Sequence, residues 1–283
     1  MLCRPSWPER HLVPVPMAVK KTRLDDLCVA RGLFDDVEQA QRSILAGEVY
    51  VDDEPLYSRA ARIPVDSVVR LKSHGSYVSR GGEKLAGALD VFGFDPTGLV
   101  CLDCGASTGG FTDCLLKRGA KSVCAVDVGY GQFAWQLRND ERVRLFERTN
   151  INLLDPEAAG APFDLAVADI SFAPLHSYIG AVRRLLSDEG TLITLVKPQF
   201  EAHRSQIGSG GLVLDAAVHE EVLIRALGTC RENGLEPQAL TYSPITGAKG
   251  NIEFLLMATC GAAGQVVDVA GVVARAHNAH DVS

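Results

Sequence analysis

The chain has 283 residues, of which 47% are hydrophobic and 22% charged, so it is long enough for one large or two unequal packed domains. Its formal net charge of −7 argues against a protein that coats nucleic acid without specificity, but it permits a local basic patch. No apolar stretch approaches the roughly 20 residues that a membrane helix needs, and prolines interrupt the N-terminus where a secretory signal needs an apolar core. Eight cysteines do not indicate a small disulfide scaffold, and the pair Cys101 and Cys104 lacks the four ligands of a structural zinc site. These features favour a cytoplasmic protein without a membrane segment or a metal.

The N-terminal part of the chain contains a short extension and a small module. Residues 1–19 are rich in proline and lack periodicity, so we expect a flexible extension there. Residues 20–72 have the pattern of an α+β module, which at about 50 residues is near the lower size limit of a domain that folds alone. Its expected elements are helices over 23–31 and 36–45 and strands over 49–51 and 67–71.

The rest of the chain has the pattern of a larger α/β domain. Two glycine clusters predict a linker over 73–82, followed by a helix that begins near Gly82. From 83 to 262, apolar runs alternate with helical patterns, which predicts a doubly wound, Rossmann-like sheet. Residues 263–283 would form a C-terminal helix or tail, because 266–277 are weakly amphipathic. The expected strands are 99–103, 122–127, 143–147, 165–169, 191–196, 240–242 and 253–258.

The most informative stretch is VCLDCGASTGGF at residues 100–111. An apolar run ends at Asp103, a glycine-rich turn follows, and a helical pattern begins near Phe111 and stops at Gly119. Such a strand, turn and helix offers small residues and free backbone N–H groups at the carboxyl end of a strand, where nucleotide-like ligands bind. The dinucleotide fingerprint has a middle glycine that makes room for a pyrophosphate, and Ser107 stands there instead. The turn therefore favours S-adenosyl-L-methionine over NAD.

Acidic residues at two strand ends fit the same cofactor. Asp103 precedes the turn and suits the ammonium group, while Asp127 ends the next apolar run, where it would meet ribose hydroxyls. The adenine edge would meet Asn150, or else Asn152 or Glu147. A ligand-free turn of ordinary chemistry is the alternative interpretation. The expected cofactor-binding residues are Asp103, Gly105, Ser107, Gly109, Asp127 and Asn150.

Four charged residues stand at predicted strand ends or on the helix before the first strand: Lys84, Asp169, Lys197 and Glu253. Each of them alone could be a surface ion. Because a buried charge is costly unless it is paired, two lysines and two acids at one rim are expected to compensate each other.

These four residues resemble the Lys-Asp-Lys-Glu tetrad of the FtsJ-like 2′-O-ribose methyltransferases. The fuller resemblance is to the TlyA family, bacterial rRNA 2′-O-methyltransferases that are also labelled haemolysins. The shared motifs are VSRGGEKL at 78–85, LDCGASTGGFTDCLL at 102–116, VDVGYGQ at 126–132, ERTNI at 147–151, ADISF at 168–172, LVKPQFE at 195–201 and GNIEF at 250–254. HGSY at 74–77 departs from the bulkier residues that some relatives have at this joint between domains.

The TlyA family joins its catalytic domain to an S4 RNA-binding domain, and the small module resembles one in RLDDLCVARGLFDDVEQAQRSILAGEVYVDDEPL. In such domains the second helix and the following turn present basic side chains to folded RNA. A solvated helical face of mixed charge is the alternative, since the module also carries many acids. The resemblance implies RNA contacts at Lys20, Lys21, Arg23, Arg31 and Arg42.

The resemblance implies a cytoplasmic monomer that uses S-adenosyl-L-methionine to methylate a ribose 2′-oxygen, on a cytidine of small- or large-subunit rRNA or of both. Its partners would be ribosomal RNA or ribosomal subunits. Lys197 would be the general base with Lys84 beside it, while Asp169 and Glu253 would orient the lysines. A lysine can take that role only if burial and a neighbouring cation lower its pKa. Two alternatives from other classes are a membrane-active haemolysin and a nucleotide-dependent oxidoreductase.

Overall fold

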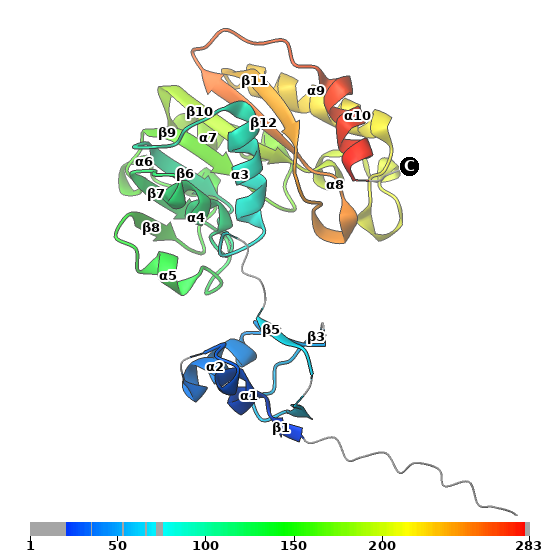
Figure 1. Ribbon diagram of the computed structural model, residues 1–283. Coiled ribbons are helices and arrows are strands. Elements are labelled where there is room, and N and C mark those ends of the chain that lie inside the picture. The colour runs from blue at the N-terminus through cyan, green and yellow to red at the C-terminus, as the bar shows by residue number, and fades with distance from the viewer. Residues whose placement is uncertain (1–20, 35, 53, 66, 72–75, 281–283) are drawn as a thin grey trace, which may run out of the picture. The chain divides into compact units, whose positions relative to one another are not determined.

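The computed structural model describes residues 21–34, 36–52, 54–65, 67–71 and 76–280. The chain divides into two compact units, one within residues 1–74 and the other within 75–283 (Figure 1). No helix in the described part of the chain is long and apolar enough to cross a membrane.

The smaller unit combines two helices with short strands. Its elements are β1 (Lys21–Arg23), α1 (Leu24–Ala30), α2 (Val37–Leu45), β2 (Val49–Val51), β3 (Glu54–Pro55), β4 (Arg62–Pro64) and β5 (Val69–Leu71). Strand β1 pairs with β4, and β2 lies between β3 and β5. Helix α2 starts after Asp36, whose carboxylate accepts a hydrogen bond from the N–H of Gln39 at 2.7 Å. Leu24, Ile44 and Val49 are fully buried in the core between helices and strands.

Two features of the smaller unit differ from the sequence prediction. Arg23 ends strand β1 instead of opening the first helix, because residues 21–23 pair with residues 62–64. The strand expected over 67–71 begins only at Val69. Strands β1, β3 and β4 were not predicted, because they are two or three residues long and, unlike the Val-Tyr-Val of β2, are not apolar runs.

The larger unit is an α/β fold around a seven-stranded sheet with the order β11-β12-β10-β9-β6-β7-β8. Its strands are β6 (Val100–Cys104), β7 (Ser122–Val126), β8 (Val143–Phe146), β9 (Phe163–Ala168), β10 (Leu186–Val196), β11 (Leu235–Tyr242) and β12 (Phe254–Cys260). Strands β8, β7, β6, β9 and β10 are parallel to one another, whereas β12 is antiparallel to both of its neighbours. The sheet is therefore mixed, with one reversed strand near an edge.

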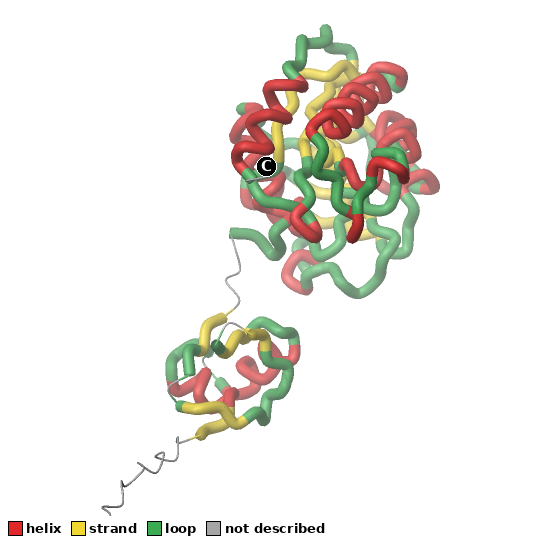
Figure 2. Tube along the Cα trace, turned by 90° about the vertical axis from the view of Figure 1, so that its right-hand side faces the viewer, coloured by secondary structure: helices red, strands yellow, loops and turns green. Residues whose placement is uncertain are grey.

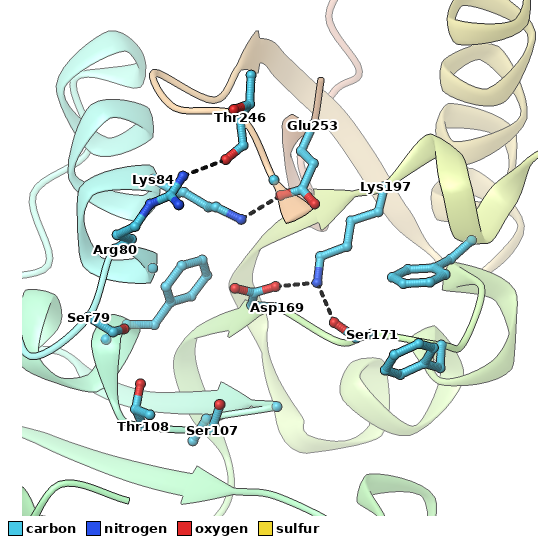
Figure 3. Close-up of a pocket in the computed structure, with 18 of the residues that line it drawn as sticks. Ser79, Arg80, Lys84, Ser107, Thr108, Asp169, Ser171, Lys197, Thr246 and Glu253 are labelled. Atoms are coloured by element: carbon cyan, nitrogen blue, oxygen red, sulfur yellow. Dashed lines mark hydrogen bonds and ion pairs between the residues drawn. The ribbon is translucent and has the colours of Figure 1, made fainter. Parts of the chain in front are cut away.

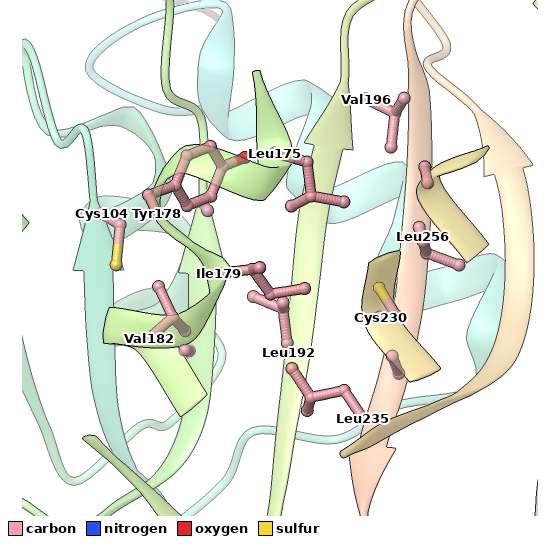
Figure 4. Packing of buried hydrophobic residues seen from close by; sticks show 14 of the residues in the cluster. Cys104, Leu175, Tyr178, Ile179, Val182, Leu192, Val196, Cys230, Leu235 and Leu256 are labelled. Carbon is pink, nitrogen blue, oxygen red and sulfur yellow. The ribbon is translucent and has the colours of Figure 1, made fainter. Parts of the chain in front are cut away.

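Helices cover both faces of this sheet (Figure 2). The longer ones are α3 (Gly81–Phe92), α4 (Gly110–Lys117), α7 (Ile179–Leu185), α9 (Ala216–Glu232) and α10 (Val269–Ala279), and the one-turn helices are α5 (Trp135–Arg138), α6 (Pro156–Ala159) and α8 (Pro198–Glu201). One buried cluster joins the sheet to α3, α4 and α5, and a second joins its other face to α7, α9 and α10. Figure 4 shows the second cluster, where Tyr178, Ile179 and Leu192 pack between helix and strands. The expected C-terminal helix is present as α10.

The direction of β12 decides where its first residues lie. Because β12 is antiparallel to β10, its amino end pairs with the carboxyl end of β10, at Phe254 and Val196. Glu253 and Lys197, the neighbours of that pair, consequently lie at the same edge of the sheet. The glycine-rich turn after β6 and the end of β9 lie at this edge too, since their strands are parallel to β10.

Candidate active site

A cleft of about 440 Å³ lies at the carboxyl edge of the parallel strands and contains all four charged residues of the predicted tetrad (Figure 3). Lys84 reaches it from the first turns of α3, and Asp169 directly follows β9. Lys197 lies between β10 and α8, and Glu253 precedes β12. Four segments that are distant in sequence therefore supply one polar cluster.

The tetrad consists of two ion pairs. Lys84 Nζ lies 2.5 Å from Glu253 Oε2, and Lys197 Nζ lies 2.5 Å from Asp169 Oδ1. The side chains of Lys84 and Glu253 are 12% and 3% exposed, and those of Lys197 and Asp169 are 7% and 23% exposed. Pairing offsets the desolvation of these nearly buried charges, as expected for a buried cluster. The structure brings the four residues together, while their catalytic roles stay predictions.

Neutral side chains and an arginine complete the cleft. Lys197 Nζ donates a second hydrogen bond to Ser171 Oγ at 2.8 Å, and Gln199 Nε2 donates to Glu253 Oε1 at 3.1 Å. Arg80 donates to the carbonyl of Thr246 at 2.8 Å (Figure 3). Sequence reasoning did not single out these residues, although Ser171 and Gln199 lie within the quoted motifs ADISF and LVKPQFE.

A second pocket of about 620 Å³ adjoins the cleft. Gly105, Ser107, Asp127 and Asn150, four of the residues expected to bind the cofactor, line it. The two cavities share part of their walls, so a ligand in the second pocket would lie next to the tetrad. The shared residues are Gly105, Ser107, Asp169, Ser171 and Phe172.

The turn after β6 is shaped by its backbone. Gly105 has φ +79°, and a Cβ there would lie 2.8 Å from the carbonyl oxygen of Asp169, so only glycine fits without displacing that segment. Asp127 holds the turn from the next strand, because its carboxylate accepts hydrogen bonds from the N–H groups of Ser107 at 2.7 Å and Gly129 at 2.6 Å. Asn150 Oδ1 likewise accepts from the N–H of Asn152 at 3.0 Å.

Two expected cofactor residues line neither cavity. Asp103 is fully buried; its Oδ2 accepts a hydrogen bond from Thr112 at 2.6 Å, and its Oδ1 has no hydrogen-bond partner among the described residues. Burial raises the pKa of Asp103 to about 7, above its usual value near 4. Gly109 has φ +94°, and a Cβ there would lie 2.6 Å from Leu137. Gly109 therefore serves the packing of α5 against the turn, and contact of either residue with a ligand stays a prediction.

The basic residues expected to bind RNA in the smaller unit differ in their partners. Lys20 lies outside the described residues, and Lys21 is exposed on β1. Arg23 donates to Asp25 at 2.6 and 2.9 Å, and Arg42 pairs with Glu38 at 3.2 Å. Arg31 donates to the backbone oxygens of residues 65 and 67, at 2.6 and 2.7 Å. Each of the three arginines thus also has a structural partner within the unit.

Comparison with known proteins identifies the family of the larger unit. Residues 77–259 match the family model of the FtsJ-like methyltransferases. The chain belongs to the FtsJ-like methyltransferase family and is a methyltransferase, which decides against the oxidoreductase alternative.

Full-length relatives show the same likeness. The chain is 42% identical to the 16S/23S rRNA (cytidine-2′-O)-methyltransferase TlyA of Mycobacterium tuberculosis (strain CDC 1551 / Oshkosh), over 84% of this chain and 89% of that protein. It is 45% identical to YqxC of Bacillus subtilis (strain 168), provisionally named an rRNA methyltransferase, over 85% of this chain and 86% of that protein. A solved structure from Streptococcus thermophilus, provisionally named a hemolysin, is 40% identical and superposes with a TM-score of 0.72, covering 93% of this chain and 98% of that one.

Proposed function

We propose that this protein transfers a methyl group from S-adenosyl-L-methionine to the 2′-oxygen of a cytidine ribose in ribosomal RNA. One observation supports this most directly: two lysine–carboxylate pairs face a cleft that shares its wall with the pocket beside the glycine-rich turn. The name of the M. tuberculosis relative supports the choice of cytidine and of both ribosomal subunits. Such a reaction would take place in the cytoplasm, where ribosomes are assembled.

The residues of the second pocket fit the cofactor. Gly105 and Ser107 form a cradle that a side chain at position 105 would fill. Asp103 precedes this turn, and its buried Oδ1, which has no partner among the described residues, would accept a hydrogen bond from the ammonium group. Asp127 would hold the ribose hydroxyls, and Asn150 the adenine edge. When bound, S-adenosyl-L-methionine supplies a methyl group on a positively charged sulfur.

The residues of the cleft would activate the ribose hydroxyl. After losing its own proton to water, the neutral Lys197 amine would accept the proton of the 2′-hydroxyl, and Asp169 would balance the positive charge that the amine then carries again. Lys84 would supply a second positive charge beside Lys197, and Glu253 neutralises that charge. Because the cleft fixes both the hydroxyl and the base, much of the rate enhancement comes from positioning.

The smaller unit would dock the RNA. We assign residues 20–72 to an S4-like RNA-binding domain, 73–82 to the linker, 83–262 to the catalytic domain and 263–283 to the C-terminal helix and tail. Exposed Lys21 and Arg42 are the best placed of the expected RNA contacts. Arg31 would contribute to RNA binding indirectly, because its side chain donates hydrogen bonds to the backbone oxygens of residues 65 and 67 and so supports that segment.

The direct test is methylation of unmodified small and large ribosomal subunits by the full chain, followed by mass spectrometric mapping of ribose methyl groups. A 2′-O-methylcytidine on either subunit, absent with Lys197→Ala, is the expected result. A methyl group on a base atom, or no methylation of either subunit, would contradict the proposal.

A further inference from the structure

Ser171 contacts the amine of Lys197 from the loop that follows β9 (Figure 3). We propose that Ser171 is a positioning residue of this site. Its hydroxyl would hold the Lys197 amine so that the lone pair of the nitrogen faces the substrate hydroxyl. This inference rests on the proposed function, because it assigns how the general base of that reaction is aligned.

The geometry of the amine gives the reason. A lysine nitrogen is tetrahedral, so beyond its bond to carbon it has three positions for protons or a lone pair. Asp169 Oδ1 at 2.5 Å and Ser171 Oγ at 2.8 Å take two of them. In the neutral amine these two acceptors bind the two N–H groups, and the lone pair is left at the third position. Two anchors thus fix both the place of Nζ and the direction of its lone pair.

The other lysine of the cleft is held differently. Among the described residues, Lys84 Nζ has one acceptor, Glu253 Oε2, and the neutral partner Gln199 binds the carboxylate of Glu253 instead of the amine. A single acceptor leaves the amine free to turn about its bond to carbon. The two-acceptor arrangement therefore distinguishes Lys197 as the aligned base and leaves Lys84 as a neighbouring charge.

The loop that carries Ser171 is fixed to the segment that carries Lys197. Phe172, next in sequence, lies with its ring centroid 5.0 Å from that of Phe200 on α8. The N–H of Leu175 donates to Glu201 Oε1 on the same helix at 2.6 Å. Since α8 begins directly after Lys197, these contacts keep the serine hydroxyl and the lysine amine in one arrangement.

The proton transfer defines what the loss of Ser171 should change. The base takes the 2′-hydroxyl proton as the oxygen–methyl bond forms and the sulfur–methyl bond breaks, and it later releases that proton to water. Without the serine hydroxyl, the amine loses one acceptor in both protonation states. Because the hydrogen bond from the charged amine is the stronger one, the neutral amine becomes relatively more stable. The other charged groups at the cleft, Lys84, Arg80, Asp169 and Glu253, are unchanged by this substitution.

The experiment compares Ser171→Ala and Ser171→Thr with the parent protein, using ribosomal subunits as substrate. Ser171→Ala should lower kcat by about tenfold through misalignment of the base, with KM for the subunit within about twofold. The pH of half-maximal kcat should fall by about half a unit or more. Because Ser171 also lines the second pocket, affinity for S-adenosyl-L-methionine is measured separately by calorimetry, and kcat is compared at saturating cofactor. Ser171→Thr, which keeps the hydroxyl, should restore both kcat and the pH profile.

Ser205→Ala is the matched control, since Ser205 is an exposed serine beyond α8 that lines neither cavity. Unchanged kcat and pH profile in Ser171→Ala would overturn the inference, as would a loss confined to KM or cofactor affinity, or no recovery with threonine. Absence of ribose methylation by the parent protein would instead contradict the proposed function, so the two failures are distinguishable.

Discussion

Each unit contains a fully buried aspartate, Asp25 in the smaller and Asp103 in the larger. The two carboxyl groups differ in how many hydrogen bonds their oxygens accept. In the smaller unit, Asp25 accepts hydrogen bonds from Arg23 and Gln41, and the hydrogen bond from Arg23 lowers the pKa of Asp25 to about 2. In the larger unit, Asp103 has one side-chain partner, Thr112, and burial raises the pKa of Asp103 to about 7.

This difference in hydrogen-bond partners does not by itself separate a structural polar group from one that contacts a ligand. Asp25 and Arg23 form a closed arrangement that stabilises the junction of β1 and α1. Among the described residues, Asp103 Oδ1 has no hydrogen-bond partner, but Asp103 lines neither cavity, whereas Lys197 lines the cleft. Buried charge alone therefore does not indicate a site, and a charged group that also borders a cavity is the stronger candidate.

The largest effect is expected at Lys197. Lys197→Ala should lower the rate of methylation by about 100-fold or more, because general-base catalysis contributes about that much. Cofactor affinity measured by calorimetry should change little, since Lys197 does not line the second pocket. Lys197→Arg should not restore activity, because a guanidinium stays protonated and cannot accept the hydroxyl proton. Near-parental rates with arginine would mean that the residue supplies charge alone.

A smaller effect is expected on stability at Asp103. Because its pKa is raised in the folded protein, the unfolded chain releases the proton first as the pH rises. The contribution of Asp103 to stability is therefore full below about pH 4 and is lost as the pH rises to about 7, by up to a few kcal/mol. Asp103→Asn, which cannot ionise, should remove this loss. Denaturant unfolding of both proteins without cofactor at pH 5 and pH 8 measures this loss of stability. Equal pH dependence in the parent protein and in Asp103→Asn would contradict the raised pKa of Asp103.

Much of the larger unit could be predicted from the sequence because its strands are apolar runs with clear ends. The start of β10 was missed, since Ser187, Asp188 and Glu189 are polar and the last two are exposed. The burial of Asp103 follows from strand alternation: Leu102 and Cys104 face one side, so Asp103 points to the other, toward Thr112 on α4.

The tetrad could be named from its resemblance to a family, but its geometry could not. Glu253 reaches the cleft because β12 is antiparallel, and strand direction is not encoded in a local pattern. The contact of Ser171 with Lys197 depends on a loop in which Phe172 has φ +64°, a conformation that side-chain types alone do not specify. Residue types indicate chemistry, whereas the choice of partners depends on tertiary structure.

The smallest effects are expected in the smaller unit, where Arg23 and Arg42 offer a matched pair. Arg23→Gln leaves the buried carboxyl of Asp25 without its cation, so the amide exchange of α1 should quicken by on the order of tenfold. Because the pKa of Asp25 is lowered in the folded protein, its contribution to stability is present above about pH 4 and is lost as the pH falls toward 2. Arg23→Gln should remove most of that acid dependence.

Arg42→Gln is the control, because it breaks only an exposed pair with Glu38 and should leave exchange in α1 unchanged. Equal exchange rates in the two variants would show that the Arg23–Asp25 pair does not stabilise this unit.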